Sequence, residues 1–244
     1  EDDKTVAVVV LTGAGERAFC AGGNLQGGQA SSGFRGGGGR NQPPATVSGA
    51  VRNLRAVMAS SQRLRDSHFI SIAAVNGACA GAGFSWACAC DLRIAAENAL
   101  FRAGFLTAGL SGDFGGTWTL PRIVGPAKAR ELYILNEKVK AVEAVRIGLA
   151  AKAIPARGDA FKAKVHQIAR GLAAAAPLAL KRIKANLLDS DKTSFAEHLD
   201  IEAERHGKCG YHPDAAEAGA AFLKKRAPSF SGVGPRAKWD MSKL

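Results

Sequence analysis

The sequence lacks any long uninterrupted apolar run. A helix that crosses a membrane needs about 20 consecutive apolar residues, and no run in these 244 residues approaches that length. The N-terminus, Glu1-Asp2-Asp3, is acidic and does not have the basic start of a secretory signal peptide. These absences predict a chain with no membrane partner, and we expect it to be cytoplasmic.

Cysteine patterns that are typical of metal or redox sites are also missing. The five cysteines are an odd number, and Cys88-Ala-Cys90 lacks the two-residue spacer of a redox motif or zinc knuckle. Three of the five lie in apolar runs, which favours reduced thiols in a cytosolic protein. The sequence therefore predicts no metal site.

Acidic residues are scarce relative to basic ones. There are 33 Lys and Arg residues against 21 Asp and Glu residues, which gives a formal net charge of +12. No basic and aromatic array or nucleic-acid motif accompanies this charge, so we expect no nucleic-acid partner. An anionic small molecule suits the charge equally well. The composition, 47% hydrophobic and 22% charged, is that of a globular chain with a sizeable core.

Two segments in which a strand leads into a small-residue turn carry the strongest signals. The apolar run 69–75 predicts a buried strand, and the turn 76–83 leads from it into a helix that begins near Phe84. Near the start, the strand 6–12 leads into Gly13-Ala14-Gly15. Such turns let a ligand approach the backbone, and a helix start offers free N–H groups and partial positive charge. The alternative is that the small residues only pack a strand against a helix.

Together these segments resemble the crotonase, or enoyl-CoA hydratase/isomerase, superfamily. The resemblance is carried by LTGAGERAFCAGGNL, by FISIAAVNGACAGAGFSWACACDLRIAAENALFRA, by GLSGDFGGTWTLPRIVGPAKARELYILNEKVKAVEAVRIGLAAKAIP and, more weakly, by AAEAGAAFLKKRAPSF. It implies an α/β fold of the ClpP/crotonase type, with a ββα spiral core over residues 1–155 and a C-terminal helical oligomerisation region over residues 156–244. Members normally carry two strands and a helix before the strand that ends at Thr12, so we expect the N-terminal strands to be missing.

The resemblance places a backbone oxyanion hole in the two turns. Its donors are expected to be the N–H groups of Ala21 and Ala82, and its ligand the thioester oxygen of an acyl-CoA. Coenzyme A enters as part of the substrate, and no permanently bound cofactor is expected. The residues that the resemblance implies for substrate and CoA binding are Cys20, Ala21, Gly22, Gly23, Asn24, Leu25, Gly81, Ala82, Phe105, Phe222 and Lys225. For Phe222 and Lys225 the alternative is an amphipathic terminal helix with a solvated basic face.

The acid and base groups decide the reaction. Hydratases of the superfamily use two glutamates, and the matching positions here are Ser85 and Phe105, neither of which can act as a general acid or base. Asp113 remains, and its apolar neighbours predict a raised pKa that suits a proton shuttle. An acid at this position is catalytic in dienoyl-CoA isomerases, phenylacetyl-CoA ring-epoxide isomerases and aryl-CoA dehalogenases, and WTLPRIVG most resembles the second of these. The alternative is that Asp113 caps the next helix.

The sequence thus predicts an acyl-CoA enzyme in which one Asp moves a double bond or isomerises a ring. Hydration, thioester hydrolysis and dehalogenation remain alternatives, and so does a CoA-thioester-binding protein without catalysis. The resemblance also implies a homotrimer, or a hexamer made of two trimers. The glycine-rich segment 26–45 is either a lid over the acyl group or a disordered loop, so the acyl group stays open.

Overall fold

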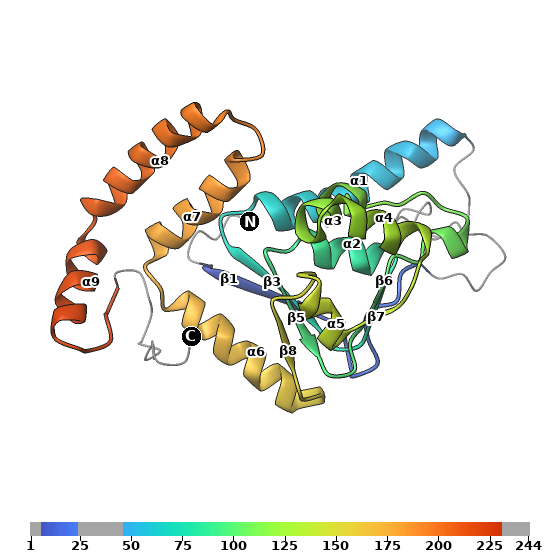
Figure 1. Ribbon diagram of the computed structural model, residues 1–244, viewed down its shortest axis with the longest axis horizontal. Coiled ribbons are helices and arrows are strands. Elements are labelled where there is room, and N and C mark those ends of the chain that lie inside the picture. The colour runs from blue at the N-terminus through green and yellow to red at the C-terminus, as the bar shows by residue number, and fades with distance from the viewer. Residues whose placement is uncertain (1–5, 24–45, 231–244) are drawn as a thin grey trace. The chain divides into compact units, whose positions relative to one another are not determined.

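The computed structural model describes residues 6–23 and 46–230 of the chain (Figure 1). The strands are β1 (Val8–Thr12), β2 (Ala18–Cys20), β3 (Ile70–Val75), β4 (Ala78–Ala80), β5 (Leu92–Ala96), β6 (Leu100–Arg102), β7 (Val139–Lys140) and β8 (Lys152–Ile154). The helices are α1 (Val47–Asp66), α2 (Ala82–Ala89), the 3₁₀ turn η1 (Leu106–Ala108), α3 (Gly116–Val124), α4 (Pro126–Ile134), α5 (Ala141–Arg146), α6 (Gly158–Ala173), α7 (Pro177–Asp189), α8 (Phe195–Gly210) and α9 (Pro213–Leu223). This mixture confirms the predicted α/β class.

The strands form two four-stranded sheets, in the orders β1-β3-β5-β8 and β2-β4-β6-β7. Strand β5 pairs in parallel with β3 and β8, and β4 pairs in parallel with β2 and β6. Parallel sheets are usually covered on both faces, and every residue of β3 is buried, as its apolar sequence predicts. The segment from Leu149 to Ile154, followed by Pro155, predicts an edge strand. Strand β8 lies at the edge of the first sheet but begins only at Lys152.

One predicted helix is shorter than expected. The pattern from Val142 to Lys152 predicts a helix with a bend or an end at Gly148. Helix α5 ends at Arg146, just before this glycine, and Lys152 already belongs to β8. The cause is Gly148, whose φ of 77° lies in the left-handed region that ends helices.

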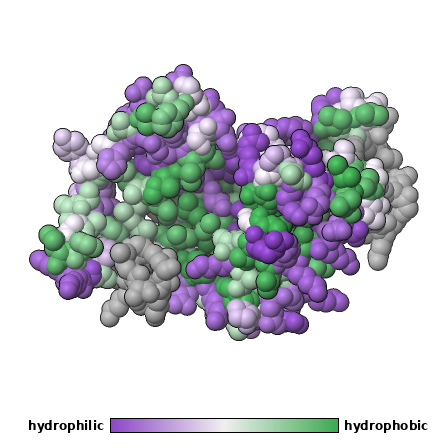
Figure 2. Space-filling view, viewed as in Figure 1, coloured by the Kyte–Doolittle hydropathy of each residue, from purple (hydrophilic) through white to green (hydrophobic). Residues whose placement is uncertain are grey.

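The chain divides into two compact units. The larger one contains Val10–Arg65 and Ser71–Lys164, and the other contains Val165–Leu244 together with short segments before Val10 and around Phe69. In the second unit, exposed apolar side chains interrupt the polar surface of α7 to α9, and Figure 2 shows hydrophobic residues gathered where Figure 1 draws α7. These side chains belong to Ile183, Leu187, Phe195, Leu199, Tyr211, Phe222 and Leu223. The domain boundary expected at residue 155 stays a prediction.

Helix α2 is held at its C-terminal end by two charged side chains. The buried guanidinium of Arg93 donates to the carbonyl oxygens of Cys90 and Leu149, each at 2.7 Å, and so satisfies an acceptor at the helix end. Asp91 accepts hydrogen bonds from the Ser71 N–H at 2.7 Å and from its hydroxyl at 2.8 Å. An acid just after a helix end opposes the helix dipole, so Asp91 is expected to bond to a group outside the helix. These bonds confirm that expectation and fix the end of α2 against β3.

The other end of α2 packs against β2 through Gly83. A Cβ at this position would lie 2.4 Å from the Cys20 carbonyl oxygen and 2.5 Å from the Cys20 Cβ. Backbone atoms cannot move aside cheaply, so we expect Gly83→Ala to lower the free energy of unfolding by about 1–3 kcal/mol, measured by urea denaturation.

Gly207 in α8 offers the matched control, because nothing lies within 4 Å of a Cβ there. Gly207→Ala should leave stability unchanged or raise it by about 0.5–1 kcal/mol, since alanine favours a helix interior. Equal stability of the two variants would contradict the packing of α2 on β2.

Candidate active site

The two small-residue turns meet at one end of the second sheet. Cys20 of β2 is in register with Cys79 of β4, so the turns that follow the two strands leave the sheet side by side. Gly22 has a φ of 91°, and a Cβ there would lie 3.1 Å from the Ala80 carbonyl oxygen and 3.7 Å from the Gly81 Cα. Glycine therefore allows one turn to contact the other.

Asn76 ties the end of β3 to the turn after β1. Its side-chain nitrogen donates to the carbonyl oxygens of Gly13 at 3.0 Å and Gly15 at 2.9 Å, and its oxygen accepts from the Gly13 N–H at 3.1 Å. The side chain is buried and its amide is used as both donor and acceptor. Sequence reasoning gave Asn76 no such role, because the partner segment lies about sixty positions away along the chain.

Helix α2 begins with a backbone donor that the helix itself does not use. It starts at Ala82, two residues before the predicted start near Phe84. The Gly81 N–H donates to the Ala103 carbonyl oxygen at 3.0 Å. The N–H of Ala82, the first residue of the helix, has no acceptor within the helix and stands at the positive end of the helix dipole. A donor in this position can stabilise a negatively charged oxygen.

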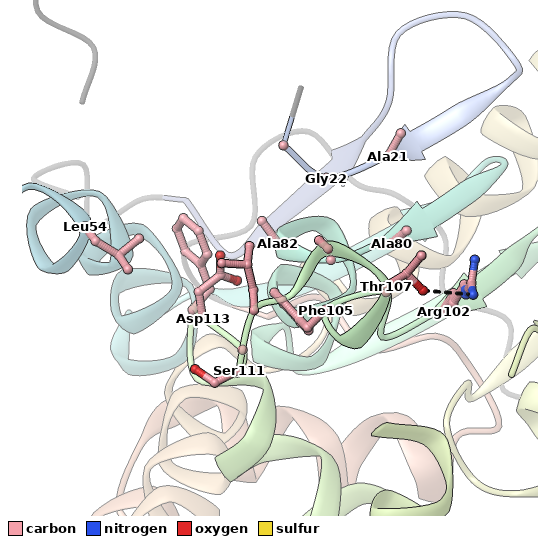
Figure 3. A pocket seen from close by; sticks show the side chains of 17 residues that line it. Ala21, Gly22, Leu54, Ala80, Ala82, Arg102, Phe105, Thr107, Ser111 and Asp113 are labelled. Carbon is pink, nitrogen blue, oxygen red and sulfur yellow. Dashed lines mark hydrogen bonds between the residues drawn. The ribbon is translucent and has the colours of Figure 1, made fainter. Parts of the chain in front are cut away.

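A cavity of about 350 Å³ lies in the larger unit between the two turns, α1 and the segment after β6 (Figure 3). It brings together many of the predicted site residues, namely Ala21, Gly22, Gly23, Gly81, Ala82, Phe105 and Asp113. The other lining residues are Leu54, Ala80, Arg102, Gly104, Thr107, Ala108, Leu110, Ser111, Gly112 and Phe114.

The other predicted site residues that the structure describes are not among the residues that line this cavity. Cys20 is half-buried in β2, directly before the first turn. Phe222 and Lys225 are exposed in the other unit, where their contact with CoA stays a prediction. Asn24, Leu25 and the segment 26–45 lie outside the described residues.

Asp113 is the only carboxyl group among the described residues that line the cavity. Burial raises its pKa from 3.8 to about 6. One carboxyl oxygen, Oδ1, is buried and has no hydrogen-bond partner among the described residues. The N-cap of α3 is Gly115, and no side chain caps that helix. The geometry therefore leaves the Asp113 carboxyl available to a substrate and gives no support to the capping alternative.

The two positions that match the family glutamates hold no acid. Phe105 lines the cavity and is 5% exposed, and Ser85 in α2 is fully buried with a hydroxyl that lacks a partner in the described part of the chain. Glu97 is the glutamate nearest in the sequence to positions 85 and 105, but it is exposed and forms an ion pair with Arg157 at 2.5 Å. No second carboxyl thus stands with Asp113 along the described cavity wall.

Asn136 holds the segment that carries Phe105. Its side-chain oxygen accepts from the Gly104 N–H at 2.7 Å, its side-chain nitrogen donates to the Thr107 hydroxyl at 2.6 Å, and its carbonyl oxygen accepts from Arg102 Nε at 3.0 Å. Asn136 has a φ of 57°, a conformation in which asparagine is enriched. The sequence analysis assigned Asn136 no role. The only local signal for it was an asparagine just after the end of a helix, α4, where a left-handed conformation is common.

The described residues contain neither a group of side chains placed to bind a metal ion nor a helix able to span a membrane. Among residues 6–23 and 46–230, no group of three or more His, Cys, Asp and Glu side chains is placed to hold a metal ion. Within the same ranges, none of the helices combines the length and apolarity that crossing a membrane requires.

Comparisons with known proteins decide the family. The enoyl-CoA hydratase/isomerase family matches residues 1–233. The chain belongs to this family. A relative from Rhodobacter capsulatus named "Probable enoyl-CoA hydratase" is 36% identical over 231 residues, which are 92% of this chain and 80% of the relative. The 1,2-epoxyphenylacetyl-CoA isomerase of Escherichia coli is 33% identical over 95% of this chain and 84% of its own length.

Solved structures of family members share the fold. The crystal structure of an enoyl-CoA hydratase from Polaromonas sp. JS666 matches with a TM-score of 0.82 and 33% identity, over 94% of this chain and 84% of that one. The crotonase-type fold and the family predicted from the sequence are thus confirmed. The relatives carry both hydratase and isomerase names, so family membership establishes an enzyme family that acts on CoA thioesters and leaves the individual reaction open.

Proposed function

We propose that this family member is an acyl-CoA isomerase in which Asp113 alone carries the proton. The observation that supports this most is the desolvated Asp113 carboxyl on the cavity wall. Of the two family glutamate positions, one holds Phe105 on the same wall and the other holds Ser85, which is fully buried in α2. Addition of water across a double bond requires groups that position and deprotonate that water, whereas a shift of the double bond requires one base that returns its proton.

The first step uses the two turns and the carboxylate together. The thioester oxygen of a 3-enoyl-CoA lies between the N–H groups of Ala21 and Ala82. The Asp113 carboxylate removes a proton from the carbon next to the thioester, and the electron pair moves into the carbonyl to give a dienolate. The two N–H groups stabilise the negative oxygen, which lowers the barrier to proton removal.

The second step returns the proton. The Asp113 carboxyl delivers it to the fourth carbon of the acyl chain, the carbonyl reforms, and the double bond now lies next to the thioester. Nothing is gained or lost overall, so the site needs no cofactor for this reaction. A base with a pKa near 6 is well matched to both steps, because it is mostly ionised at neutral pH and still holds a proton after the first step.

A paired assay on the purified full chain tests the proposal. A 3-enoyl-CoA and a 2-enoyl-CoA are supplied separately, and the absorbance of the conjugated enoyl thioester is followed. We expect absorbance to rise with the 3-enoyl substrate and to stay constant with the 2-enoyl substrate. A fall with the 2-enoyl substrate and no rise with the other would show hydration and would contradict the proposal.

Isomerisation of an aryl-ring epoxide is a second candidate. It is supported by the similarity to 1,2-epoxyphenylacetyl-CoA isomerase and by Phe105 and Phe114 on the cavity wall, since aromatic rings pack well against one another. Mass-neutral conversion of a phenylacetyl-CoA ring epoxide, followed by a change in its ultraviolet spectrum, would favour this substrate over a linear 3-enoyl-CoA.

Assembly and location stay predictions. The exposed apolar side chains of α7 to α9 support a trimer-based assembly, because apolar surface of this kind is commonly buried between subunits. Light scattering on the purified protein should give three or six times the chain mass of 25.3 kDa.

A further inference from the structure

Tyr133 of α4 lies directly behind the cavity wall. Its ring is parallel to that of Phe105, with centroids 6.0 Å apart and an angle of 4°, and it meets Phe84 edge-on at 6.4 Å. Its Cε1 atom lies 3.8 Å from the position that a Cβ on Gly112 would occupy. Both Phe105 and Gly112 line the cavity, and Gly112 precedes Asp113. Tyr133 therefore backs the part of the wall that adjoins the reactive carboxyl.

The hydroxyl of Tyr133 reaches the place where α3 begins. A Cβ on Gly116 would lie 2.4 Å from the Tyr133 oxygen and 2.4 Å from the Ser85 Oγ, so the two hydroxyls lie close together beneath Gly116. Both oxygens are buried, and neither makes a hydrogen bond of regular geometry within the described residues. The Ser85 hydroxyl is nevertheless near enough to lower the pKa of Tyr133, against the larger effect of burial, which raises it. Tyr133 thus spans from Phe105 to Ser85 and fills the space between them.

We propose that Tyr133 is the specificity-determining residue that keeps water away from Asp113 and so favours proton transfer over the addition of water. This rests on the proposed function of the same cavity. The parallel contact holds the Phe105 ring against the wall, and the hydroxyl end occupies the space beneath Gly116 that a water molecule or a longer polar side chain at position 85 would need.

The charged and titratable groups around Asp113 show why burial governs the pKa of its carboxyl. Arg102 is the other charged residue among the described cavity-lining residues, and Figure 3 draws it across the view from Asp113 with Phe105 between them. Arg102 is already bound to the Asn136 carbonyl oxygen and the Thr107 hydroxyl. Behind the wall stand Tyr133 and Cys88, whose pKa values are both raised by burial, so both are neutral near pH 7. The state of the Asp113 carboxyl therefore depends on exclusion of water.

Two substitutions at position 133 separate the ring from the hydroxyl. Tyr133→Ala removes the ring and opens space behind Phe105, while Tyr133→Phe keeps the ring and removes only the hydroxyl near Ser85. Tyr211, which is 96% exposed in the other unit, provides the matched control Tyr211→Ala. If Tyr133→Ala does not fold, Tyr133→Leu replaces it, with a smaller change expected in the same direction.

The first measurement needs no substrate. Carbon-13 NMR titration of labelled Asp carboxyls, with Asp113→Asn to assign the signal, gives the pKa of Asp113 directly. We expect a value of about 6 in the parent protein and no change in Tyr133→Phe and Tyr211→Ala. In Tyr133→Ala water reaches the carboxylate and stabilises its charged form, so the pKa should fall by about one unit or more. An unchanged pKa in Tyr133→Ala, or an equal fall in Tyr133→Phe, would overturn the proposal.

The second measurement is the fate of a 2-enoyl-CoA. Tyr133→Ala should form a detectable amount of the 3-hydroxyacyl-CoA water adduct, whereas the parent and Tyr133→Phe should form none, as chromatography of the products would show. Absence of the adduct with Tyr133→Ala would count against Tyr133 as the barrier to water. If the parent fails to isomerise a 3-enoyl-CoA, the proposed function fails. The titration would still decide whether Tyr133 keeps water away from the Asp113 carboxyl.

Discussion

Asp113→Asn should lower kcat for 3-enoyl-CoA isomerisation by about 10²–10⁴-fold, the usual contribution of a general acid or base. The amide has nearly the same shape as the carboxyl but cannot accept the proton from the carbon next to the thioester. Substrate binding should persist, because the amide removes no cavity-lining atom, so KM should change little. Steady-state kinetics on both enzymes, with deuterium exchange into the bound acyl-CoA as a second readout, measures the loss.

Stability provides the control for this variant. Burial raises the pKa of Asp113 from 3.8 to about 6, so the folded protein holds this proton more tightly than the unfolded chain does. The carboxyl therefore destabilises the folded state increasingly as pH rises from 3.8 through about 6, and by a constant amount above that. Asp113→Asn lacks this penalty and should be at least as stable as the parent at pH 7. A stable variant with full turnover would exclude Asp113 as the base.

The pH dependence of the parent enzyme follows from the same carboxyl. The base must be ionised before it can take a proton, so kcat/KM should rise with pH through a midpoint of about 6 and then level off. An unburied aspartate would give a midpoint near 3.8. Initial rates between pH 4.5 and pH 8 would locate the midpoint, and a rate that is flat over this range would contradict a desolvated base.

Much of the fold could be predicted because the signals are local. The apolar run 69–75 corresponds to β3, and the spacing of apolar residues over 47–67 predicts a helix that corresponds to α1. The observed bounds differ from the predicted ones by one residue in each case. The resemblance also located the two turns, which the structure places side by side through the register of β2 and β4. Local patterns and a recognised family sufficed here because the spacing of apolar residues along each element reflects which of its faces is buried.

What could not be predicted depends on contacts between distant segments. Asn76 bridges to Gly13 and Gly15, and Tyr133 stacks on Phe105, but neither residue type marks such a partner in the sequence. The space beneath Gly116 exists only once α2, α3 and α4 are packed together. The sequence already shows Ser85 and Phe105 at the two glutamate positions, but only the structure shows that Tyr133 stacks on one and brings its hydroxyl close to the other.

Ala82→Pro should lower kcat by about 10²–10³-fold, the cost of removing one donor from an oxyanion hole. Proline has no N–H, so the dienolate oxygen would lose its donor at the start of α2. The helix itself should persist, because Ala82 is its first residue and proline is well tolerated there. Kinetics with a 3-enoyl-CoA, together with circular dichroism to verify the fold, would measure the loss.

Ala82→Gly is the matched control, because it changes the side chain and keeps the N–H. We expect it to retain kcat within a few-fold, with a small loss of helix stability of about 1 kcal/mol. If both variants lose activity equally, the side chain of Ala82 matters and the donor does not. If neither does, the thioester oxygen is held elsewhere. A loss confined to Ala82→Pro would connect the turn found in the sequence to charge stabilisation at the dienolate, independently of any evidence from Asp113.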